Sequence, residues 1–270
     1  MFIRQKYNSS KYRVVPLVNT IRCNPQKFAL FLSAVHTPNQ KRFPALSCPM
    51  EENAYFYGDH EKHLKPSKKH LMRLIEYIAH KDFGKISVSN KKREDLYGLH
   101  TEADRIAAKN EALQQIENIY DKPLLPKAWY IFEGSTNPDI YIEGKDYVIL
   151  CEGKWTESHI TTKTEHLKAK NENRNQMIRH IQGALHATNK KIYAFYIVDI
   201  HCNYMDCLNE SAFETQLNDE TIKIDSEEKA NILNAFYGYT TWQELEKIIE
   251  GLRFLEKDQI DQINGGNTYA

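Results

Sequence analysis

The sequence predicts an α/β fold, in which helices flank one central β-sheet. Two short apolar runs separated by a turn, over residues 140–142 and 147–151, predict a β-hairpin. A helical pattern over residues 176–187 comes next, and a β-rich run over residues 191–200 follows it. Strands that alternate with a helix in this order are typical of α/β domains.

Size and composition indicate an ordinary globular protein. The chain has 270 residues, of which 41% are hydrophobic and 27% are charged. No run approaches the ~18 apolar residues that a membrane span needs, and the N-terminus lacks the apolar core of a secretory signal. The five cysteines show no paired spacing, and their odd number predicts reduced thiols. We therefore expect a cytoplasmic protein with no membrane partner.

The first part of the chain, residues 1–93, is predicted to be a basic accessory region with helical and irregular structure. Prolines interrupt its first half, where a helix is predicted over residues 26–35. Leucines and isoleucines at helical spacing predict a second helix over residues 65–80. The polar run at residues 82–93 then connects this region to the second one, residues 94–270.

The second region begins with a predicted helix over residues 101–120 and a predicted first core strand over residues 127–133. The hairpin follows, and its strand at residues 147–151 is apolar on both faces, which predicts a central position in the sheet. The run at residues 191–200 predicts another central strand. Residues 203–239 are polar and acidic, and we assign no helix or strand to them.

After that stretch, Thr241 opens a capping-box pattern and begins a predicted amphipathic helix. Its apolar residues are more typical of core packing than of a partner site.

Three charged residues flank the hairpin. Asp139 begins its first strand, and Glu152 and Lys154 end its second strand. Side chains alternate along a strand, so Glu152 and Lys154 project from the same face, and Asp139 can lie beside them. Two carboxylates and an amine at a buried sheet end are costly unless their charge is compensated. A divalent, oxygen-binding cation such as Mg²⁺ would compensate it.

The sequences Pro138-Asp139 and Glu152-Gly153-Lys154 resemble the motif of the PD-(D/E)XK nuclease superfamily, the fold of many restriction endonucleases. The resemblance implies a restriction-endonuclease-like core with a mixed central β-sheet. It implies that Asp139, Glu152 and the carbonyl of Gly153 bind Mg²⁺, with Mn²⁺ as a substitute. It implies that Lys154 orients the attacking water, and that the reaction is hydrolysis of DNA phosphodiester bonds.

Two further residues follow from the same resemblance. Members of the superfamily place a helix before the first core strand, often with an acid that reaches the metal, and Glu102 is our choice for it. A helix dipole that favours an exposed acid explains Glu102 equally well. Exonuclease-like members carry Gln-x3-Tyr after the motif, whereas this chain has Gln176 followed by His180. The superfamily often has a glutamine here that helps to position substrate or the lysine, and the resemblance gives this role to Gln176. The alternative is a Gln176 with no catalytic role.

Several alternatives stay open at this point. Glu-x-Lys is a common pattern that occurs three times here, and the hairpin could be a solvated surface feature. The chain could also be a non-catalytic nucleic-acid-binding or interaction protein that retains the fold, or a phosphatase of small esters. The sequence leaves a homodimer open as well.

The distribution of charge is uneven although the net charge is zero. Residues 1–50 contain no acid and residues 60–93 carry an excess of bases, whereas residues 206–261 are strongly acidic. A phosphate backbone would be attracted to the two basic segments and repelled by the acidic one. The alternative is that the basic and acidic segments pair with each other in the folded chain.

Overall fold

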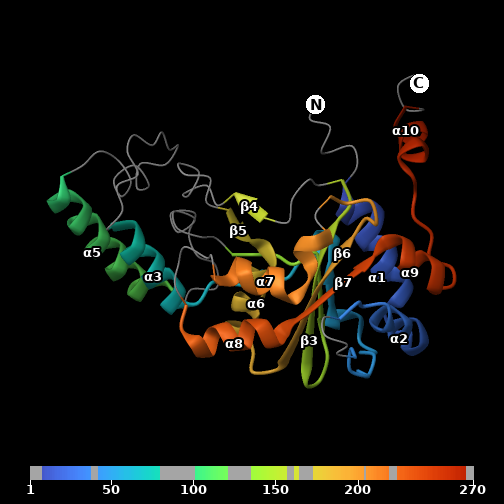
Figure 1. Ribbon diagram of the computed structural model, residues 1–270, viewed down its shortest axis with the longest axis horizontal. Coiled ribbons are helices and arrows are strands. Elements are labelled where there is room, and N and C mark those ends of the chain that lie inside the picture. The colour runs from blue at the N-terminus through green and yellow to red at the C-terminus, as the bar shows by residue number, and fades with distance from the viewer. Residues whose placement is uncertain are drawn as a thin grey trace.

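A computed structural model describes residues 8–37, 42–79, 101–120, 135–156, 161–163, 173–203, 205–218 and 224–265. Its centre is a five-stranded sheet in the order β1-β2-β3-β6-β7 (Figure 1). The strands are β1 (Tyr55–Tyr57), β2 (Ile140–Glu143), β3 (Tyr147–Lys154), β6 (Lys191–Val198) and β7 (Phe236–Thr241). β2 runs antiparallel to both of its neighbours, β1 and β3, while β3, β6 and β7 are mutually parallel. The predicted α/β class with a mixed sheet is confirmed.

The predicted hairpin is confirmed as β2 and β3. Ile140 lies opposite Cys151 and Glu143 opposite Val148, and the turn is closed by a hydrogen bond from Gly144 N–H to the Tyr147 carbonyl. Every residue of β3 is buried, because β3 lies in the middle of the sheet with packed layers on both faces. The alternative of a solvated surface hairpin is therefore wrong.

Helices on one face connect the parallel strands. Between β3 and β6 lies α6 (Gln176–Ala187), whose bounds match the prediction. Between β6 and β7 lie η8 (Met205–Leu208), α7 (Glu210–Asn218) and α8 (Ser226–Ala235). Apolar side chains of α6, α7 and α8 pack with alternate residues of the strands, such as Val148, Leu150 and Tyr196, in one core cluster. This is the layer in front of and beside the sheet in Figure 1.

The opposite face is covered by the N-terminal part of the chain. Here lie η2 (Ser10–Val14), α1 (Val15–Ile21) and α2 (Pro25–Ser33), together with α9 (Trp242–Ile248). Pro25 stands at the first position of α2, and the side chain of Asn24 caps it by accepting from Lys27 N–H. The other alternate residues of the strands, among them Ile149, Cys151 and Phe195, complete this second cluster.

The N-terminal region thus shares the core of the sheet. β1, preceded by η4 (Glu52–Ala54) and followed by η5 (Gly58–His60), pairs with β2 and forms an edge of the sheet. Residues 8–57, assigned by sequence to an accessory region, contribute this strand and one covering layer. The predicted boundary at residue 93 and the predicted strand at 127–133 lie outside the described residues.

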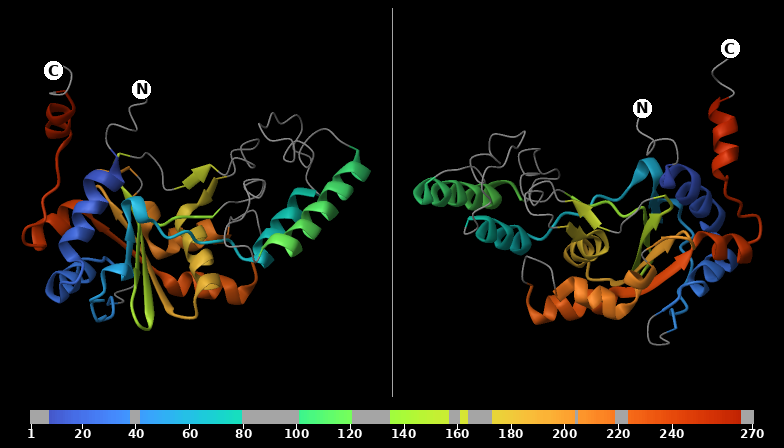
Figure 2. Two further views of the ribbon diagram at one scale, coloured as in Figure 1. Left: turned by 180° about the vertical axis from the view of Figure 1, so that it is seen from behind. Right: turned by 45° about the horizontal axis from the view of Figure 1, so that its top comes forward.

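Two helices project to one side of the sheet. They are α3 (Lys68–Ala79) and α5 (Glu102–Ile119), both predicted, and they pack against each other (Figures 1 and 2). Thr101 caps α5 in a reciprocal capping box with Asp104. Arg73 of α3 forms ion pairs with Asp225, which caps α8, and with Glu228 of α8, and these pairs fasten α3 and α5 to the sheet domain.

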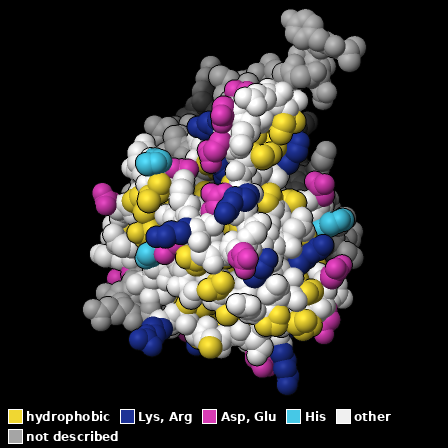
Figure 3. Space-filling view, turned by 90° about the vertical axis from the view of Figure 1, so that its right-hand side faces the viewer, with side chains coloured by type: hydrophobic (Ala, Val, Ile, Leu, Met, Phe, Trp, Pro, Cys, Tyr) yellow, Lys and Arg dark blue, Asp and Glu magenta, His cyan; other side chains and the backbone are white. Residues whose placement is uncertain are grey.

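These ion pairs also bear on the uneven charge. Lys69 pairs with Asp225, and Arg13 lies 3.7 Å from Glu256, so bases of the two basic segments are matched by acids of the acidic segment. On the side of α1, α2 and α9, lysines, arginines and acids are intermingled (Figure 3). Part of the basic charge is therefore neutralised within the molecule.

The remaining elements are short. β4 (Thr161–Lys163) and β5 (Asn173–Asn175) form a separate two-stranded antiparallel sheet, and α10 (Lys257–Gly265) ends the described chain. The helix expected after Thr241 stops at Ile248, and residues 203–239, which received no element by sequence, contain α7, α8 and part of β7. Among the described residues, none of the helices combines the length and the hydropathy needed to cross a bilayer.

Candidate functional site

Asp139, Glu152 and Lys154 meet at the edge where β2 begins and β3 ends. Lys154 Nζ donates a hydrogen bond to Glu152 Oε1 at 2.7 Å, and Gly153 N–H donates to Asp139 Oδ2 at 2.8 Å. The register of the hairpin, with Ile140 opposite Cys151, places Asp139 next to Glu152 across the two strands. All three side chains lie on the α6 side of the sheet, because they alternate with residues of the other face.

The N-terminal turn of α6 supplies two more side chains. Gln176 is the first residue of α6 and accepts a hydrogen bond from Lys154 Nζ at 2.9 Å. His180 lies one turn later on the same side of the helix and places Nε2 2.8 Å from Glu152 Oε2. Asn175 starts the helix there by accepting hydrogen bonds from the N–H groups of Met177 and Ile178.

His180 has a second partner on its other nitrogen. Its Nδ1 lies 2.7 Å from the hydroxyl of Thr136, and both residues are buried. Thr136 in turn exchanges two backbone hydrogen bonds with Leu64, of 2.8 and 2.9 Å. A continuous chain of contacts therefore runs from the backbone of Thr136 through His180 to Glu152.

Gly153 separates the two charged residues of β3 because its own position has no room for a side chain. A β-carbon there would lie 2.9 Å from the ring of Trp242 and 3.3 Å from Val14. Trp242 also donates from Nε1 to the Lys154 carbonyl at 2.9 Å. The close approach of this indole fixes the end of β3 and requires glycine between Glu152 and Lys154.

The two carboxyl groups differ in their electrostatics. Burial and the neighbouring charge of Glu152 raise the pKa of Asp139 well above its ordinary value, although Gly153 N–H and Lys154 oppose the rise. Burial also acts to raise the pKa of Glu152, but the charge of Lys154 and the hydrogen bond from His180 outweigh it and lower the pKa. Glu152 is therefore the carboxyl group of the two that ionises more readily.

His180 is neutral in this arrangement. It is fully buried, and burial lowers the pKa of its imidazole despite the opposing pull of Glu152. Cys151, on the other face of β3, has a pKa raised by burial and by the two nearby carboxylates, so it is an inert thiol.

The donors present fit a hard divalent cation with an incomplete protein shell. Asp139 and Glu152 supply carboxylate oxygens, and the Gly153 carbonyl points to the same side as its N–H, which faces Asp139. Mg²⁺ commonly takes only one or two carboxylates and fills its other positions with water and phosphate oxygens. A cation here would offset the burial and the charge of Glu152, which together raise the pKa of Asp139. Within the described residues, no group of three or more His, Cys, Asp and Glu side chains is arranged as a metal site.

Glu102, which the sequence suggested as a further acid, is not brought to this site. It is exposed at the first turn of α5. The opposite end of α5 lies near α6: Tyr120 contacts His186 of α6 and donates a hydrogen bond to the Pro66 carbonyl at 2.8 Å. Eighteen residues of helix span about 27 Å, and Figures 1 and 2 show α5 extending away from the sheet.

An acid near Asp139 that the sequence reading did not select is Glu61. It accepts a hydrogen bond from Asn137 Nδ2 at 3.1 Å, and its charge adds to the rise in the pKa of Asp139. Glu61 lies near Asp139 because Leu64, three residues later, pairs with Thr136 in an antiparallel bridge. No local pattern marks that pairing. His180, in contrast, could have been found, because its four-residue spacing from Gln176 puts both side chains on one helix face.

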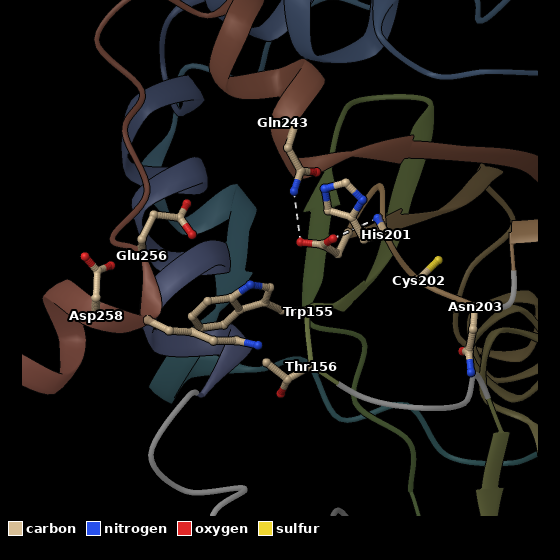
Figure 4. A pocket seen from close by; sticks show the side chains of 10 residues that line it. Trp155, Thr156, His201, Cys202, Asn203, Gln243, Glu256 and Asp258 are labelled. Carbon is tan, nitrogen blue, oxygen red and sulfur yellow. Dashed lines mark hydrogen bonds between the residues drawn. The ribbon is translucent and has the colours of Figure 1, made fainter.

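A pocket of about 830 Å³ opens beyond the ends of β3 and β6 (Figure 4). Trp155 lines it and, because it directly follows Lys154, points to the opposite side of the sheet. Asp199 is held there by hydrogen bonds from Gln243 Nε2 at 2.9 Å and from His201 N–H at 2.8 Å. With Glu256 and Asp258 against a single lysine, the lining is predominantly acidic and would repel phosphate.

Comparisons of the chain with family models, with curated proteins and with solved structures gave no match.

Proposed function

We propose that this protein is a metal-dependent nuclease that hydrolyses DNA phosphodiester bonds, with a restriction-endonuclease-like fold. The observation that carries the proposal is the meeting of Asp139, Glu152 and Lys154 at one end of the sheet, on the side that Gln176 and His180 complete. The mixed central sheet, in which the antiparallel hairpin of β2 and β3 is followed by helix α6 and the parallel strand β6, supports the proposal, because the resemblance implies a mixed central β-sheet.

In this proposal Asp139, Glu152 and the Gly153 carbonyl are the ligands of Mg²⁺, with Mn²⁺ as a substitute. The bound ion supplies Lewis acidity and lowers the pKa of a coordinated water. Lys154, an ammonium whose carbon chain is buried, orients the attacking water and stabilises negative charge on the phosphate. Gln176 keeps Lys154 in place by accepting a hydrogen bond from one of the three N–H groups of its ammonium.

The substrate assignment rests on chemistry of the site and on charge. A metal–lysine site of this kind acts on phosphate esters, and the excess of bases in the sequence of residues 60–93 would attract a phosphate backbone. We propose a cytoplasmic location because the four described cysteines, Cys23, Cys48, Cys151 and Cys202, are free thiols. We propose no fixed oligomeric state: a measurement of the molecular mass of the protein in solution distinguishes a homodimer from a monomer.

The direct test is incubation of supercoiled plasmid with the purified protein and either Mg²⁺, Mn²⁺ or a chelator. Cleavage is expected only with the metal ions. Lys154→Ala should lower the cleavage rate about 100-fold or more, equivalent to about 3 kcal/mol, while DNA affinity stays roughly the same.

The matched control is Lys145→Ala. Lys145 belongs to a second Glu-Gly-Lys sequence, but it is exposed at the turn between β2 and β3. This variant should cut DNA like the parent. Metal-independent DNA binding without cleavage would identify a non-catalytic binding protein, and hydrolysis of p-nitrophenyl phosphate without DNA cleavage would indicate a small-ester phosphatase. If Lys154→Ala cuts as fast as the parent, the assignment of Lys154 is wrong.

A further inference from the structure

We propose that His180 is a positioning residue for Glu152, and that the hydroxyl of Thr136 selects the imidazole tautomer with its proton on Nε2. The inference rests on the proposed function, because it treats Glu152 as a metal ligand. It assigns a role to two residues that the proposed reaction does not otherwise use.

The direction of each hydrogen bond follows from the chemistry of the three groups. An ionised carboxylate only accepts, so His180 Nε2 must donate to Glu152 Oε2 across their 2.8 Å separation. With its proton on Nε2, the imidazole has a lone pair on Nδ1 that accepts a hydrogen bond. The Thr136 hydroxyl, 2.7 Å away, is the donor. The alternative tautomer would turn the lone pair of Nε2 toward a buried carboxylate.

The chain of contacts leaves the carboxylate little freedom. Glu152 is 2% exposed, with Lys154 on Oε1 and His180 on Oε2. Each oxygen still has a second lone pair with which it could bind a metal ion. His180 is held by α6 and Thr136 by its backbone bonds to Leu64, so two separate elements fix the plane of the carboxylate. Partners of this kind orient metal-binding groups in other sites and commonly change metal affinity 10–100-fold.

The experiment compares two pairs of variants, each with a matched control. His180→Leu removes the donor, whereas His180→Gln can place an amide N–H where Nε2 was. Thr136→Val removes only the hydroxyl, whereas Thr136→Ser retains it. Mn²⁺ affinity is measured on DNA-free protein by electron paramagnetic resonance, and thermal unfolding of the metal-free variants is measured alongside.

We expect His180→Leu to bind Mn²⁺ about 10–100-fold more weakly, and His180→Gln to recover most of the loss. Thr136→Val should weaken binding more than Thr136→Ser does. If His180→Leu is unfolded, the threonine pair carries the same comparison. Equal Mn²⁺ affinity of folded His180→Leu and the parent, or of the two threonine variants, overturns the inference.

A second readout separates this inference from the proposed function. ¹H–¹⁵N spectra of the metal-free protein report the tautomer of His180, and the Nε2–H form is expected. The Nδ1–H form or an imidazolium at neutral pH would overturn the inference even in an active nuclease. A parent protein that shows the expected tautomer, but neither binds Mn²⁺ nor cuts DNA, would overturn the nuclease function and leave the hydrogen-bond assignment intact.

Discussion

Asp139 accepts a hydrogen bond from the backbone N–H of Gly153 at 2.8 Å, which joins the start of β2 to the end of β3. The contact brings the Asp139 carboxyl to the one residue of β3 that has no side chain. On the other face of the sheet, Trp242 occupies the space that a side chain at Gly153 would need. Gly153 thus holds Asp139 through its backbone N–H, and its lack of a β-carbon leaves room for the ring of Trp242 in the core.

Replacement of Asp139 by Asn is expected to stabilise the metal-free protein at neutral pH. The folded-state pKa of Asp139 is raised, chiefly by burial and then by the charge of Glu152. The contribution of Asp139 to stability is therefore present below the unfolded pKa and is lost as pH rises through the folded pKa. Asn resembles the protonated acid and keeps an oxygen that can accept from Gly153 N–H.

Urea unfolding of both proteins from pH 4 to pH 8 measures this difference. The two should be about equally stable at acidic pH, and Asp139→Asn should become the more stable of the two as the pH rises. Added Mg²⁺ should raise the unfolding midpoint of the parent but not of the variant. A variant that is less stable than the parent at pH 8 without metal would contradict the electrostatic account.

Replacement of Gly153 by Ala is expected to destabilise the fold by about 1–3 kcal/mol through overpacking. The new β-carbon would lie 2.9 Å from Cζ2 of Trp242, a buried ring that cannot move aside freely. A double-mutant cycle with Trp242→Phe tests the cause, because phenylalanine lacks the outer atoms of the indole. Denaturant unfolding should show a smaller penalty for Gly153→Ala in the Trp242→Phe background. An unchanged penalty would place the strain elsewhere.

Replacement of Glu102 by Gln is expected to leave metal binding and DNA cleavage unchanged. Glu102 is exposed in the first turn of α5, which extends away from the sheet. Steady-state cleavage kinetics check this, with Asp139→Asn as the inactive reference. A large loss of activity in Glu102→Gln would mean that α5 approaches the site during catalysis.

Replacement of Asp225 by Asn is expected to loosen the attachment of α3 to α8 without removing the helix cap. Asn caps helices as well as Asp does, but it loses the ionic contacts with Lys69 and Arg73. Lys69, the Glu228 N–H and Arg73 lower the pKa of Asp225. The contribution of Asp225 to the stability of the fold is therefore present at pH values above its unfolded-state pKa. It is lost as the pH falls through its folded-state pKa.

The measurement is hydrogen exchange of the α3 amides at neutral pH, at low and at high salt. Asp225→Asn should exchange faster than the parent at low salt, and the difference should shrink as salt screens the pairs of the parent. Equal exchange at low salt would show that the ion pairs contribute nothing to the attachment.

The sequence by itself determined the elements whose patterns are local. The hairpin, α6 and β6 follow from alternation, from helical spacing and from a turn with glycine, and the structure has each of them. The sequence also predicts that Glu152 and Lys154 lie on one face of the sheet, because side chains alternate between the two faces along a strand.

Only the tertiary structure decided which distant segments complete the sheet and the site. β1 is a strand of three residues that gains its stability from pairing with β2, and β7 contains a glycine with φ of 96° and a register shift. Such strands have too weak a local pattern to be predicted. The contacts of His180 with Glu152 and Thr136, and of Gly153 with Trp242, arise from the packing of whole layers. Side-chain contact between remote residues depends on that packing, and a single sequence carries no local signal of it.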